Sequence, residues 1–201
     1  MNNFYEIIPR LYIGSIEAAS DFEDIKQRKI SVIVNCTKDI DNKFELRLLK
    51  PIEEAPSDVQ FWLMENSYYI KYFRIPIDDN GKEEEVENFY NYVVELLPKI
   101  DKLYQYGKTI LVHCLAGNQR SAAFICAFLM YREKLIYEEA IGLLLNKKPN
   151  VFYFGEQINF NKALLRIDHE IINDILKIEY VQLGSRKTNY VDMKNAYPQI
   201  M

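Results

Sequence analysis

Two short apolar runs constrain the fold of this chain more than any other feature of its sequence. They are SVIVN (31–35) and TILVH (109–113), and continuous apolar runs of this length are typical of strands buried on both faces of a parallel sheet. Segments with helical periodicity lie between and after them, and strands that alternate with helices are typical of α/β folds. The sequence therefore predicts a single α/β domain with a central, mostly parallel, twisted sheet flanked by helices.

The remaining elements are predicted from periodicity and from residues that begin or end a helix or strand. Further strands are expected at FYEII (4–8), LYIG (11–14) and SYYIKYFRIPI (67–77). Helices are expected over 15–29, about 84–104 with Pro98 kinking or splitting it, from about Ser121, over about 137–146, and from about Glu156. In the first helix Ser15 is the expected N-cap, with Ala18, Phe22 and Ile25 on one face. A capping box at Ser57-x-x-Gln60 could begin one more short helix.

The length of 201 residues suits one domain with a sizeable core rather than two. We expect the folded domain to cover residues 1–177 and residues 178–201 to form a C-terminal tail, whose order the sequence leaves open. The sequence does not indicate the oligomeric state.

The charge and the cysteines exclude several classes of protein. A net charge of −4 provides no field that would attract nucleic acid or an anionic membrane. Three cysteines without close pairs argue against a disulfide scaffold and against a zinc site, which favours a reducing compartment. The N-terminus does not have the pattern of a secretory signal, and the longest apolar run is about half a membrane span. We expect a soluble cytoplasmic protein, with the nucleus left open as a further location.

The stretch HCLAGNQRS (113–121) joins a buried strand to an apolar, enclosed helix. Ligands of such sheets bind beyond the carboxyl ends of the strands, and a helix N-terminus there favours an anion. Gly117 would let the backbone curl so that its N–H groups converge, and Arg120 would hold two oxygens at once. In this positive surrounding Cys114 should be a thiolate at neutral pH. The stretch predicts a phosphate-binding loop that aims a nucleophile at a tetrahedral anion, the chemistry of a cysteine-dependent phosphatase.

Several of these residues also suit a purely structural role. For Cys114 the alternative is a buried structural thiol, which the spacing to Arg120 disfavours. Cys36 ends a buried strand, so it could form a protective disulfide with Cys114, but a small packed side chain is the preferred interpretation. Cys126 faces the core. The acidic run at 82–87 is expected to be a solvated first helical turn, with a preference for substrates with basic flanks as the alternative.

The stretch resembles the phosphate-binding signature of protein tyrosine phosphatases: His, Cys, five residues, Arg and then Ser. Its Leu-Ala-Gly start and the short chain are most similar to the dual-specificity phosphatase family. The resemblance extends to residues 7–37, to RIPIDDN (74–80), which is similar to the general-acid segment of that family, and to the helices over 127–165. It covers roughly residues 5–167. Two features depart from the family pattern: a long segment from Asp39 to Ser67, and Asn118-Gln119 as the filling of the loop.

The resemblance implies a role for each site residue. Cys114 attacks phosphorus and becomes phosphocysteine, Asp79 rather than Asp78 is the general acid and base, and Ser121 donates a hydrogen bond to the departing thiolate. His113 orients the loop and supports the low thiol pKa. The phosphate oxygens are held by the Arg120 side chain and by the backbone N–H groups of Leu115, Ala116, Gly117, Asn118, Gln119 and Arg120. No metal and no cofactor are needed.

Three functions remain open from the sequence. The first is a protein phosphatase acting on phosphotyrosine and phosphoserine or phosphothreonine. The second applies the same mechanism to phosphoinositides, phosphorylated glucans or RNA 5′-phosphates, and the third is a non-catalytic module that binds phosphate. The loop contains neither the lysines that lipid phosphatases tend to carry nor the second histidine of the RNA enzymes, which favours the first. The expected partner is a phosphorylated protein, with no nucleic acid and no membrane.

Overall fold

The computed structural model describes residues 4–44, 70–152 and 160–183. The chain divides into two compact units, residues 1–168 and residues 169–201. The first unit holds the sheet and its helices. In the second unit the structure describes the continuation of one helix. The predicted capping box at Ser57 and Gln60 lies outside the described residues, and the predicted domain boundary at residue 177 stays a prediction.

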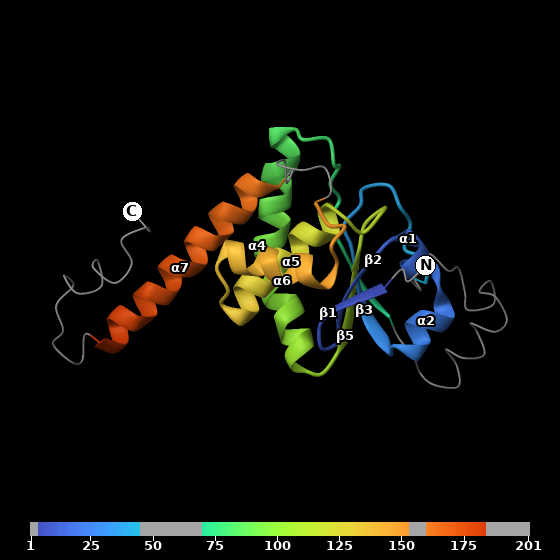
Figure 1. The fold of residues 1–201 in the computed structure, drawn as a ribbon, viewed down its shortest axis with the longest axis horizontal. Coiled ribbons are helices and arrows are strands. Elements are labelled where there is room, and N and C mark those ends of the chain that lie inside the picture. The colour runs from blue at the N-terminus through green and yellow to red at the C-terminus, as the bar shows by residue number, and fades with distance from the viewer. Residues whose placement is uncertain (1–3, 45–69, 153–159, 184–201) are drawn as a thin grey trace. The chain divides into compact units, whose positions relative to one another are not determined.

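Strands and helices are interspersed along the described part of the chain (Figure 1). The strands are β1 (Phe4–Ile8), β2 (Leu11–Gly14), β3 (Ile30–Asn35), β4 (Lys71–Arg74) and β5 (Thr109–His113). The helices are α1 (Ile16–Ser20), α2 (Phe22–Gln27), α4 (Glu83–Gln105), α5 (Arg120–Glu133), α6 (Tyr137–Lys147) and α7 (Asn161–Leu183).

The strands form one mostly parallel sheet in the order β1-β2-β5-β3-β4. Only the β1–β2 pair is antiparallel among the strands that the structure describes. The last residues of the parallel strands lie side by side, because Gly14 and Asn35 both pair with His113, and Asn35 also pairs with Arg74. The carboxyl ends of the parallel strands therefore meet at one edge of the sheet, where the loop after His113 begins. The predicted fold class is confirmed.

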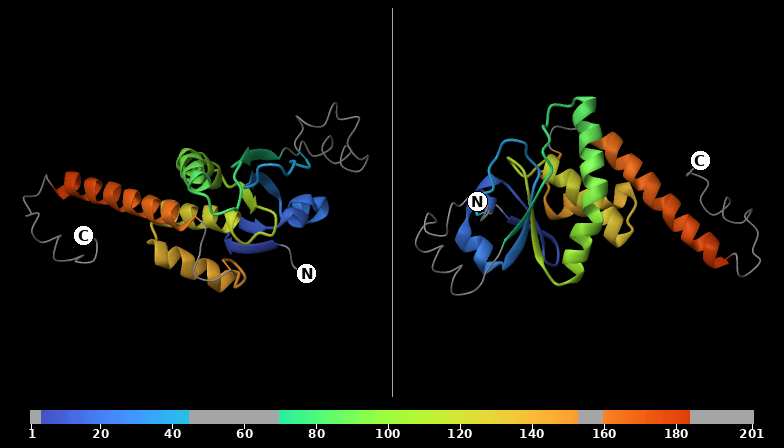
Figure 2. Two further views of the ribbon diagram at one scale, coloured as in Figure 1. Left: turned by 90° about the horizontal axis from the view of Figure 1, so that it is seen from above. Right: turned by 180° about the vertical axis from the view of Figure 1, so that it is seen from behind.

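Helices cover both faces of the sheet. In the views of Figures 1 and 2, α1 and α2 lie on one face and α4, α5 and α6 lie on the other. β5 runs through the centre, and each of its residues is buried, as expected for a strand covered on both sides. α5 is buried along ten consecutive residues from Ser121 to Met130, which confirms the prediction of an enclosed central helix.

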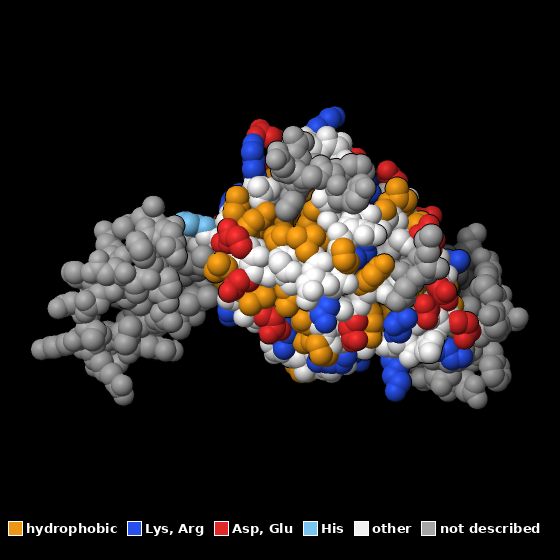
Figure 3. All heavy atoms as spheres, in the orientation of Figure 1, with side chains coloured by type: hydrophobic (Ala, Val, Ile, Leu, Met, Phe, Trp, Pro, Cys, Tyr) orange, Lys and Arg blue, Asp and Glu red, His pale blue; other side chains and the backbone are white. Residues whose placement is uncertain are grey.

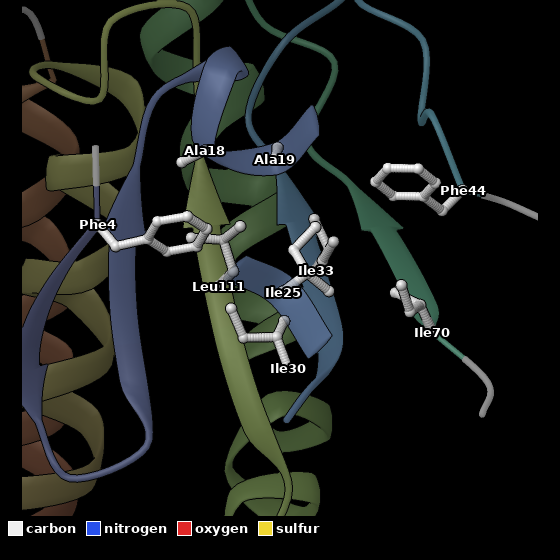
Figure 4. Close-up of a cluster of buried hydrophobic side chains, with 9 residues drawn as sticks. All are labelled: Phe4, Ala18, Ala19, Ile25, Ile30, Ile33, Phe44, Ile70 and Leu111. Carbon is white, nitrogen blue, oxygen red and sulfur yellow. The ribbon is translucent and has the colours of Figure 1, made fainter. Parts of the chain in front are cut away.

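Under α1 and α2 a compact apolar cluster fixes these helices to the sheet (Figure 4). Its members come from both helices, from three strands and from the residues that flank the undescribed range 45–69. They are Phe4, Ala18, Ala19, Ile25, Ile30, Ile33, Phe44, Ile70 and Leu111. Side chains of a strand alternate between its faces, so the neighbours of Leu111 in β5 pack toward α4 and α5.

The predicted helix over 15–29 is wrong in one respect, because it is two short helices. Asp21 has an extended backbone between α1 and α2, and its carboxylate accepts a hydrogen bond of 3.0 Å from the backbone N–H of Asp24. Asp favours such a cap over a helix interior, which is why the periodic segment breaks there. Ser15 is the N-cap residue of α1, but its hydroxyl donates to the carboxylate of Glu17 instead of capping the helix.

Two other predictions differ from the structure, and a third concerns residues that the structure does not describe. β4 ends at Arg74, three residues before the predicted end of that strand. α4 continues through Pro98 without being split. α7 begins at Asn161, and Glu156, its predicted start, lies outside the described residues.

The surface carries charges of both signs. On the face shown in Figure 3, acidic and basic side chains lie next to one another among apolar ones, without a large area of either sign over the described residues. This mixture agrees with a net charge of −4 for the whole chain.

Candidate active site

Cys114 is the first residue after β5 and lies at the edge of the sheet where the parallel strands end. Its side chain is almost fully buried, with 3% exposed. Its Sγ lies 3.2 Å from the hydroxyl oxygen of Ser121, in the first turn of α5. The strand thus places the cysteine at the N-terminus of the central helix, next to the hydroxyl of Ser121, whose role in catalysis stays a prediction.

The surroundings of Cys114 favour its thiolate. Burial by itself raises the pKa of the thiol, but the hydroxyl of Ser121, the backbone N–H of Ser121, the charge of Arg120 and the backbone N–H of Asn118 together lower the pKa below its usual value. Hydrogen bonds and a cation that stabilise the charged form outweigh desolvation here. The sulfur is therefore poised to act as a nucleophile.

Gly117 makes the curl of the loop possible. Its φ is +72°, and a Cβ at this position would lie 2.7 Å from the backbone oxygen of Gly14 at the end of β2. The loop is also tied to the start of α1, because the backbone N–H of Ile16 donates to the carbonyl of Leu115 at 3.1 Å. The glycine is thus required both for its backbone conformation and for close contact with β2.

The N-terminus of α5 leaves hydrogen-bond donors available at the loop. Gln119 is the N-cap residue, but its side chain makes no capping hydrogen bond. The first N–H groups of a helix have no partner within the helix. Arg120, the first helical residue, donates from Nη1 to the carbonyl of Ile77 at 3.3 Å. Its buried Nε has no hydrogen-bond partner among the described residues. A helix N-terminus with such donors can hold a tetrahedral anion.

The bond from Arg120 to Ile77 brings the predicted general-acid segment to the loop. This segment leaves β4 beside β3, because the backbone N–H of Ile75 donates to the carbonyl of Asn35 at 2.9 Å. Ile75 and Ile77 are fully buried and anchor the segment in the core. The two aspartates follow directly after Ile77.

Asp78 and Asp79 differ in their surroundings. The Asp78 backbone N–H donates to the carboxylate of Glu85 at 3.0 Å, and its own carboxylate lies 3.6 Å from Nζ of Lys38. The Asp79 side chain is exposed. The carboxylate of Asp78 is therefore paired with a cation. The choice of Asp79 as general acid stays a prediction.

The acidic run at 82–87 is only partly a solvated helical turn. Glu83 and Glu84 are exposed, but Glu85 is buried and lies 3.9 Å from Nζ of Lys38. The expectation of a fully solvated run is therefore wrong at Glu85, because this carboxylate holds the backbone of Asp78.

His113 is a buried, neutral histidine. Burial lowers its pKa to about 4, a hydrogen bond with the backbone of Cys114 opposes this shift, and the charges of Arg74 and Arg120 add to it. A neutral ring supplies no positive charge to the thiolate. Any support that His113 lends to the low thiol pKa therefore acts through the geometry of the loop, and its orienting role stays a prediction.

The other two cysteines are buried free thiols. Burial raises the pKa of Cys126. Burial and the neighbouring Cys114 raise the pKa of Cys36, against the charge of Arg120. The backbone N–H of Cys36 donates to the carbonyl of His113 at 2.8 Å, so it lies beside the start of the loop. A disulfide between Cys36 and Cys114 stays a prediction.

Sequence reasoning missed the residues that support the loop from other parts of the chain. Lys148, at the end of α6, places its Nζ 2.5 Å from Oδ1 of Asn118. The backbone N–H of Phe152 donates to the carbonyl of Asn118 at 3.0 Å. In the sequence Lys148 is one of two adjacent lysines before a proline, which suggests an exposed helix end, and no local signal marks it as buried.

Asn35 and Arg74 were missed for the same reason. The side chain of Asn35 donates to the carbonyl of Ile40 at 2.9 Å and accepts from the hydroxyl of Thr37 at 2.6 Å. Arg74 donates to the carbonyl of Thr37 at 2.9 Å and to that of Ile40 at 2.8 Å. Together these bonds fix the segment after β3 at the edge of the sheet that carries Cys114.

Two further features concern residues 4–44, 70–152 and 160–183. Within them, no group of three or more His, Cys, Asp or Glu side chains is placed to hold a metal ion. None of the helices that they contain is long and apolar enough to cross a membrane.

The sequence of this chain is similar to those of known proteins. Residues 11–170 match the sequence model of the family described as dual specificity phosphatase, catalytic domain. Dual specificity protein phosphatase Mpk3 of Drosophila melanogaster is 29% identical over 166 residues, which are 81% of this chain and 34% of the relative. Human dual specificity protein phosphatase 6 is 28% identical over 163 residues, 79% of this chain and 36% of the relative. The chain thus spans about a third of the length of these relatives.

Solved structures show the same fold. Human DUSP28 has a TM-score of 0.65 at 18% identity, covering 85% of this chain and 96% of that chain. DUSP15 has a TM-score of 0.61 at 19% identity, covering 94% of this chain and 99% of that chain. These structures support the fold, and the match to the family model shows to which family the chain is related. The chain belongs to the dual specificity phosphatase family, within the superfamily of cysteine-based protein tyrosine phosphatases.

Proposed function

We propose that this chain is a protein phosphatase that hydrolyses phosphotyrosine and phosphoserine or phosphothreonine through a phosphocysteine intermediate. Members of its family are generally phosphoric monoester hydrolases. The observation that carries the proposal is the placement of Cys114, Ser121 and Arg120 at one helix N-terminus, with a thiol whose pKa is lowered.

In the first step the Cys114 thiolate attacks phosphorus and the bond to the leaving oxygen breaks. Arg120 and the backbone N–H groups of residues 115–120 stabilise the equatorial oxygens as charge develops on them. Asp79 gives its proton to the leaving phenoxide or alkoxide. The products of this step are phosphocysteine and the free hydroxyl of the substrate.

In the second step a water molecule attacks the phosphocysteine. Asp79, now ionised, takes a proton from the water, and the phosphorus–sulfur bond breaks to release inorganic phosphate. Ser121, 3.2 Å from the sulfur, donates a hydrogen bond that stabilises the thiolate as it leaves. His113 holds the start of the loop in position for both steps.

The burial of the lysine that contacts the loop favours a protein substrate over a lipid substrate. A phosphoinositide carries further phosphates, which exposed lysines near the loop would bind. Lys148 contacts the loop, but it is only 5% exposed and so does not reach a ligand outside it. Leu115 is 55% exposed at the loop and offers an apolar contact to a peptide side chain.

The proposal includes the partner, the location and the bounds of the catalytic domain. The partner is a phosphorylated protein, neither nucleic acid nor membrane takes part, and the place of action is the cytoplasm, or the cytoplasm and the nucleus. The catalytic domain covers residues 1–177, and residues 178–201 form a tail. No metal and no cofactor enter the reaction.

A substrate panel with two active-site variants tests the proposal. Rates are measured on phosphotyrosine and phosphothreonine peptides, phosphoinositides and RNA 5′-triphosphate ends. We expect both peptides to be hydrolysed, phosphotyrosine faster. Cys114→Ser should be inactive. Arg120→Lys should be nearly inactive, because the ammonium of lysine does not replace the planar guanidinium, which binds two oxygens at once. Arg166→Lys, at an exposed arginine paired with Glu87, should keep full activity.

Two results would contradict the proposal. Turnover of lipid or RNA alone would mean that the same mechanism acts on another substrate class. Binding of phosphate analogues without turnover of any substrate would indicate a non-catalytic module.

A further inference from the structure

The segment after α6 holds one residue of the phosphate-binding loop from two sides. Asn118 is bound through its side chain by Nζ of Lys148 at 2.5 Å and through its carbonyl by the backbone N–H of Phe152 at 3.0 Å. Its own backbone N–H is one of the groups that lower the pKa of Cys114 by hydrogen bonding. Asn118 therefore links the end of α6 to the nucleophile.

Lys148 is unusual among the lysines of the described residues because it is buried. Only 5% of the residue is exposed, and its Nζ lies 5.1 Å from the centroid of the Tyr5 ring. A buried ammonium loses the hydration of its charge and is retained only where other groups compensate it. Here the compensation comes from the oxygen of Asn118, the face of an aromatic ring and the last turn of α6, where a cation is favoured.

The ionisation of Lys148 reflects both its burial and its closeness to the nucleophile. Desolvation lowers the pKa of its ammonium, and the negative charge of the Cys114 thiolate raises it. Attraction between the two groups is reciprocal, so the ammonium must favour the thiolate in turn.

Phe152 adds a second sign that this segment is constrained. It is a buried residue with a φ of +55°, a conformation that side chains other than glycine rarely adopt. Such strain persists only where the surrounding structure enforces it, and it concentrates at functional sites. The backbone here is shaped so that the N–H of Phe152 reaches the loop.

We propose that Lys148 is a positioning residue of the active site. It holds Asn118 so that the loop keeps the conformation that binds phosphate. Its ammonium group is also a second fixed cation, in addition to that of Arg120, that acts on Cys114. The inference deepens the proposed function and rests on it for the role in catalysis. Lys148 does not touch the substrate. It acts through Asn118 and through its field at the sulfur.

Other charged or titratable groups lie near Cys114. Arg120 comes from α5, neutral His113 from the end of β5, and the protonated thiol of Cys36 from the end of β3. Lys148→Met removes both the charge and the bond to Asn118, whereas Lys148→Arg keeps a cation at the same position.

The test measures the thiolate of Cys114 without using any substrate. Alkylation by iodoacetamide, a neutral reagent, is followed from pH 5 to pH 9 and assigned to Cys114 by mass spectrometry. The variants are Lys148→Met, Lys148→Arg and Lys147→Met, a control that removes the same charge from the exposed neighbour. Loss of a partly desolvated cation near the sulfur should slow alkylation of Lys148→Met at pH 5.5 by about three- to tenfold.

The loss of a cation near Cys114 determines in which direction the alkylation rate changes and over which pH range. Removing a cation raises the thiol pKa, so the thiolate fraction falls at low pH, and the rates of all variants converge above that pKa. Lys148→Arg should restore most of the wild-type rate, and Lys147→Met should match wild type throughout. With an active enzyme, the acidic limb of the kcat/KM profile should move to higher pH in Lys148→Met only.

Identical alkylation profiles for Lys148→Met and wild type would overturn the inference, whatever the activity. Equal slowing in Lys147→Met would also overturn it, since net charge rather than position would then be the cause. If alkylation behaves as expected while no phosphoester is hydrolysed, the inference about the loop stands and the proposed function fails. Melting temperatures of all variants separate this effect from a loss of folded protein.

Discussion

Replacing Gly117 with alanine tests whether the loop needs its close contact with β2. The added Cβ would lie 2.7 Å from the oxygen and 2.8 Å from the carbon of the Gly14 carbonyl. Ordinary contacts of a Cβ begin at 3.4 Å, so either the loop or β2 must move by about 0.7 Å. The obstacle is backbone within the sheet rather than the end of a flexible side chain, so the loop is the part that gives way.

A matched control separates the two parts of the destabilisation, the strain of the left-handed backbone and the steric overlap of the added Cβ. Gly107 follows the end of α4, has a φ of +78°, and has nothing within 4 Å of the position that a Cβ would take. Alanine there bears only the left-handed backbone strain, about 1–2 kcal/mol. At Gly117 the same strain is joined by overpacking of about 1–3 kcal/mol. We expect Gly117→Ala to lower the free energy of unfolding by roughly 2–5 kcal/mol, and Gly107→Ala by about 1–2 kcal/mol.

The loss of activity should separate the two variants more clearly than the loss of stability. A misplacement of about 1 Å in a catalytic group costs about 10²-fold in rate, so a shift near 0.7 Å should lower kcat/KM by roughly 10- to 10²-fold. Gly107→Ala should stay within about twofold of wild type, because it lies outside the loop. The assays are urea denaturation and initial rates on a phosphotyrosine peptide.

The reasoning would be refuted by equal behaviour of the two variants. If Gly117→Ala loses no more stability than Gly107→Ala and keeps the wild-type kcat/KM, then the loop tolerates a displaced backbone. The contact between Gly117 and Gly14 would then play no part in holding the nucleophile.

The remaining predictions concern the general acid and the buried histidine. Asp79→Asn should lower the turnover number by about 10²–10⁴-fold, flatten the basic limb of the pH profile and spare substrates with good leaving groups. Asp78→Asn should only break the ion pair with Lys38. The reverse result would assign the general acid to Asp78. The pKa of His113 is lowered to about 4 in the folded state, so its neutral form stabilises the fold above the unfolded-state pKa of about 6.5, and this stability is lost as the pH falls toward 4. The free energy of unfolding should therefore fall between pH 6.5 and 4 by a few kcal/mol more in wild type than in His113→Gln, about 1.4 kcal/mol for each unit of pKa difference; parallel curves would show that His113 is not buried in its neutral form.

Features set by local sequence were predictable. SVIVN and TILVH are strands because apolar runs of that length have few other stable arrangements, and their carboxyl ends meet because the sheet is parallel. The position of the loop at 113–121 was predictable because apolar segments of strand length and of helix length flank it, whereas the chemical roles of its cysteine, glycine and arginine stay predictions. Local signals also compete, and Asp21 shows this, because one capping side chain divides a segment whose periodicity predicts a single helix.

Features set by contacts between distant segments were not predictable. Glu85 lies in a run of charges that suits an exposed helical turn, but it is buried because the backbone of Asp78 needs an acceptor there. Lys148 lies 30 positions from Asn118 in the sequence, and nothing near it indicates a partner. Composition and periodicity describe how one segment meets its surroundings on average. They do not say which polar group of another segment it will meet.

The uncommon loop filling and the buried lysine explain each other. A side-chain amide at Asn118 provides an oxygen that a hydrophobic residue would lack, and Lys148 is a buried cation that needs such an oxygen. Removing either partner alone leaves a buried polar group without this bond, which costs about 1–3 kcal/mol or more for a charge. Replacing both with apolar side chains would remove that cost but would also remove a cation from the surroundings of Cys114. Asn118 and Lys148 therefore form one unit, which stabilises the fold only as a pair and acts on the nucleophile through its charge.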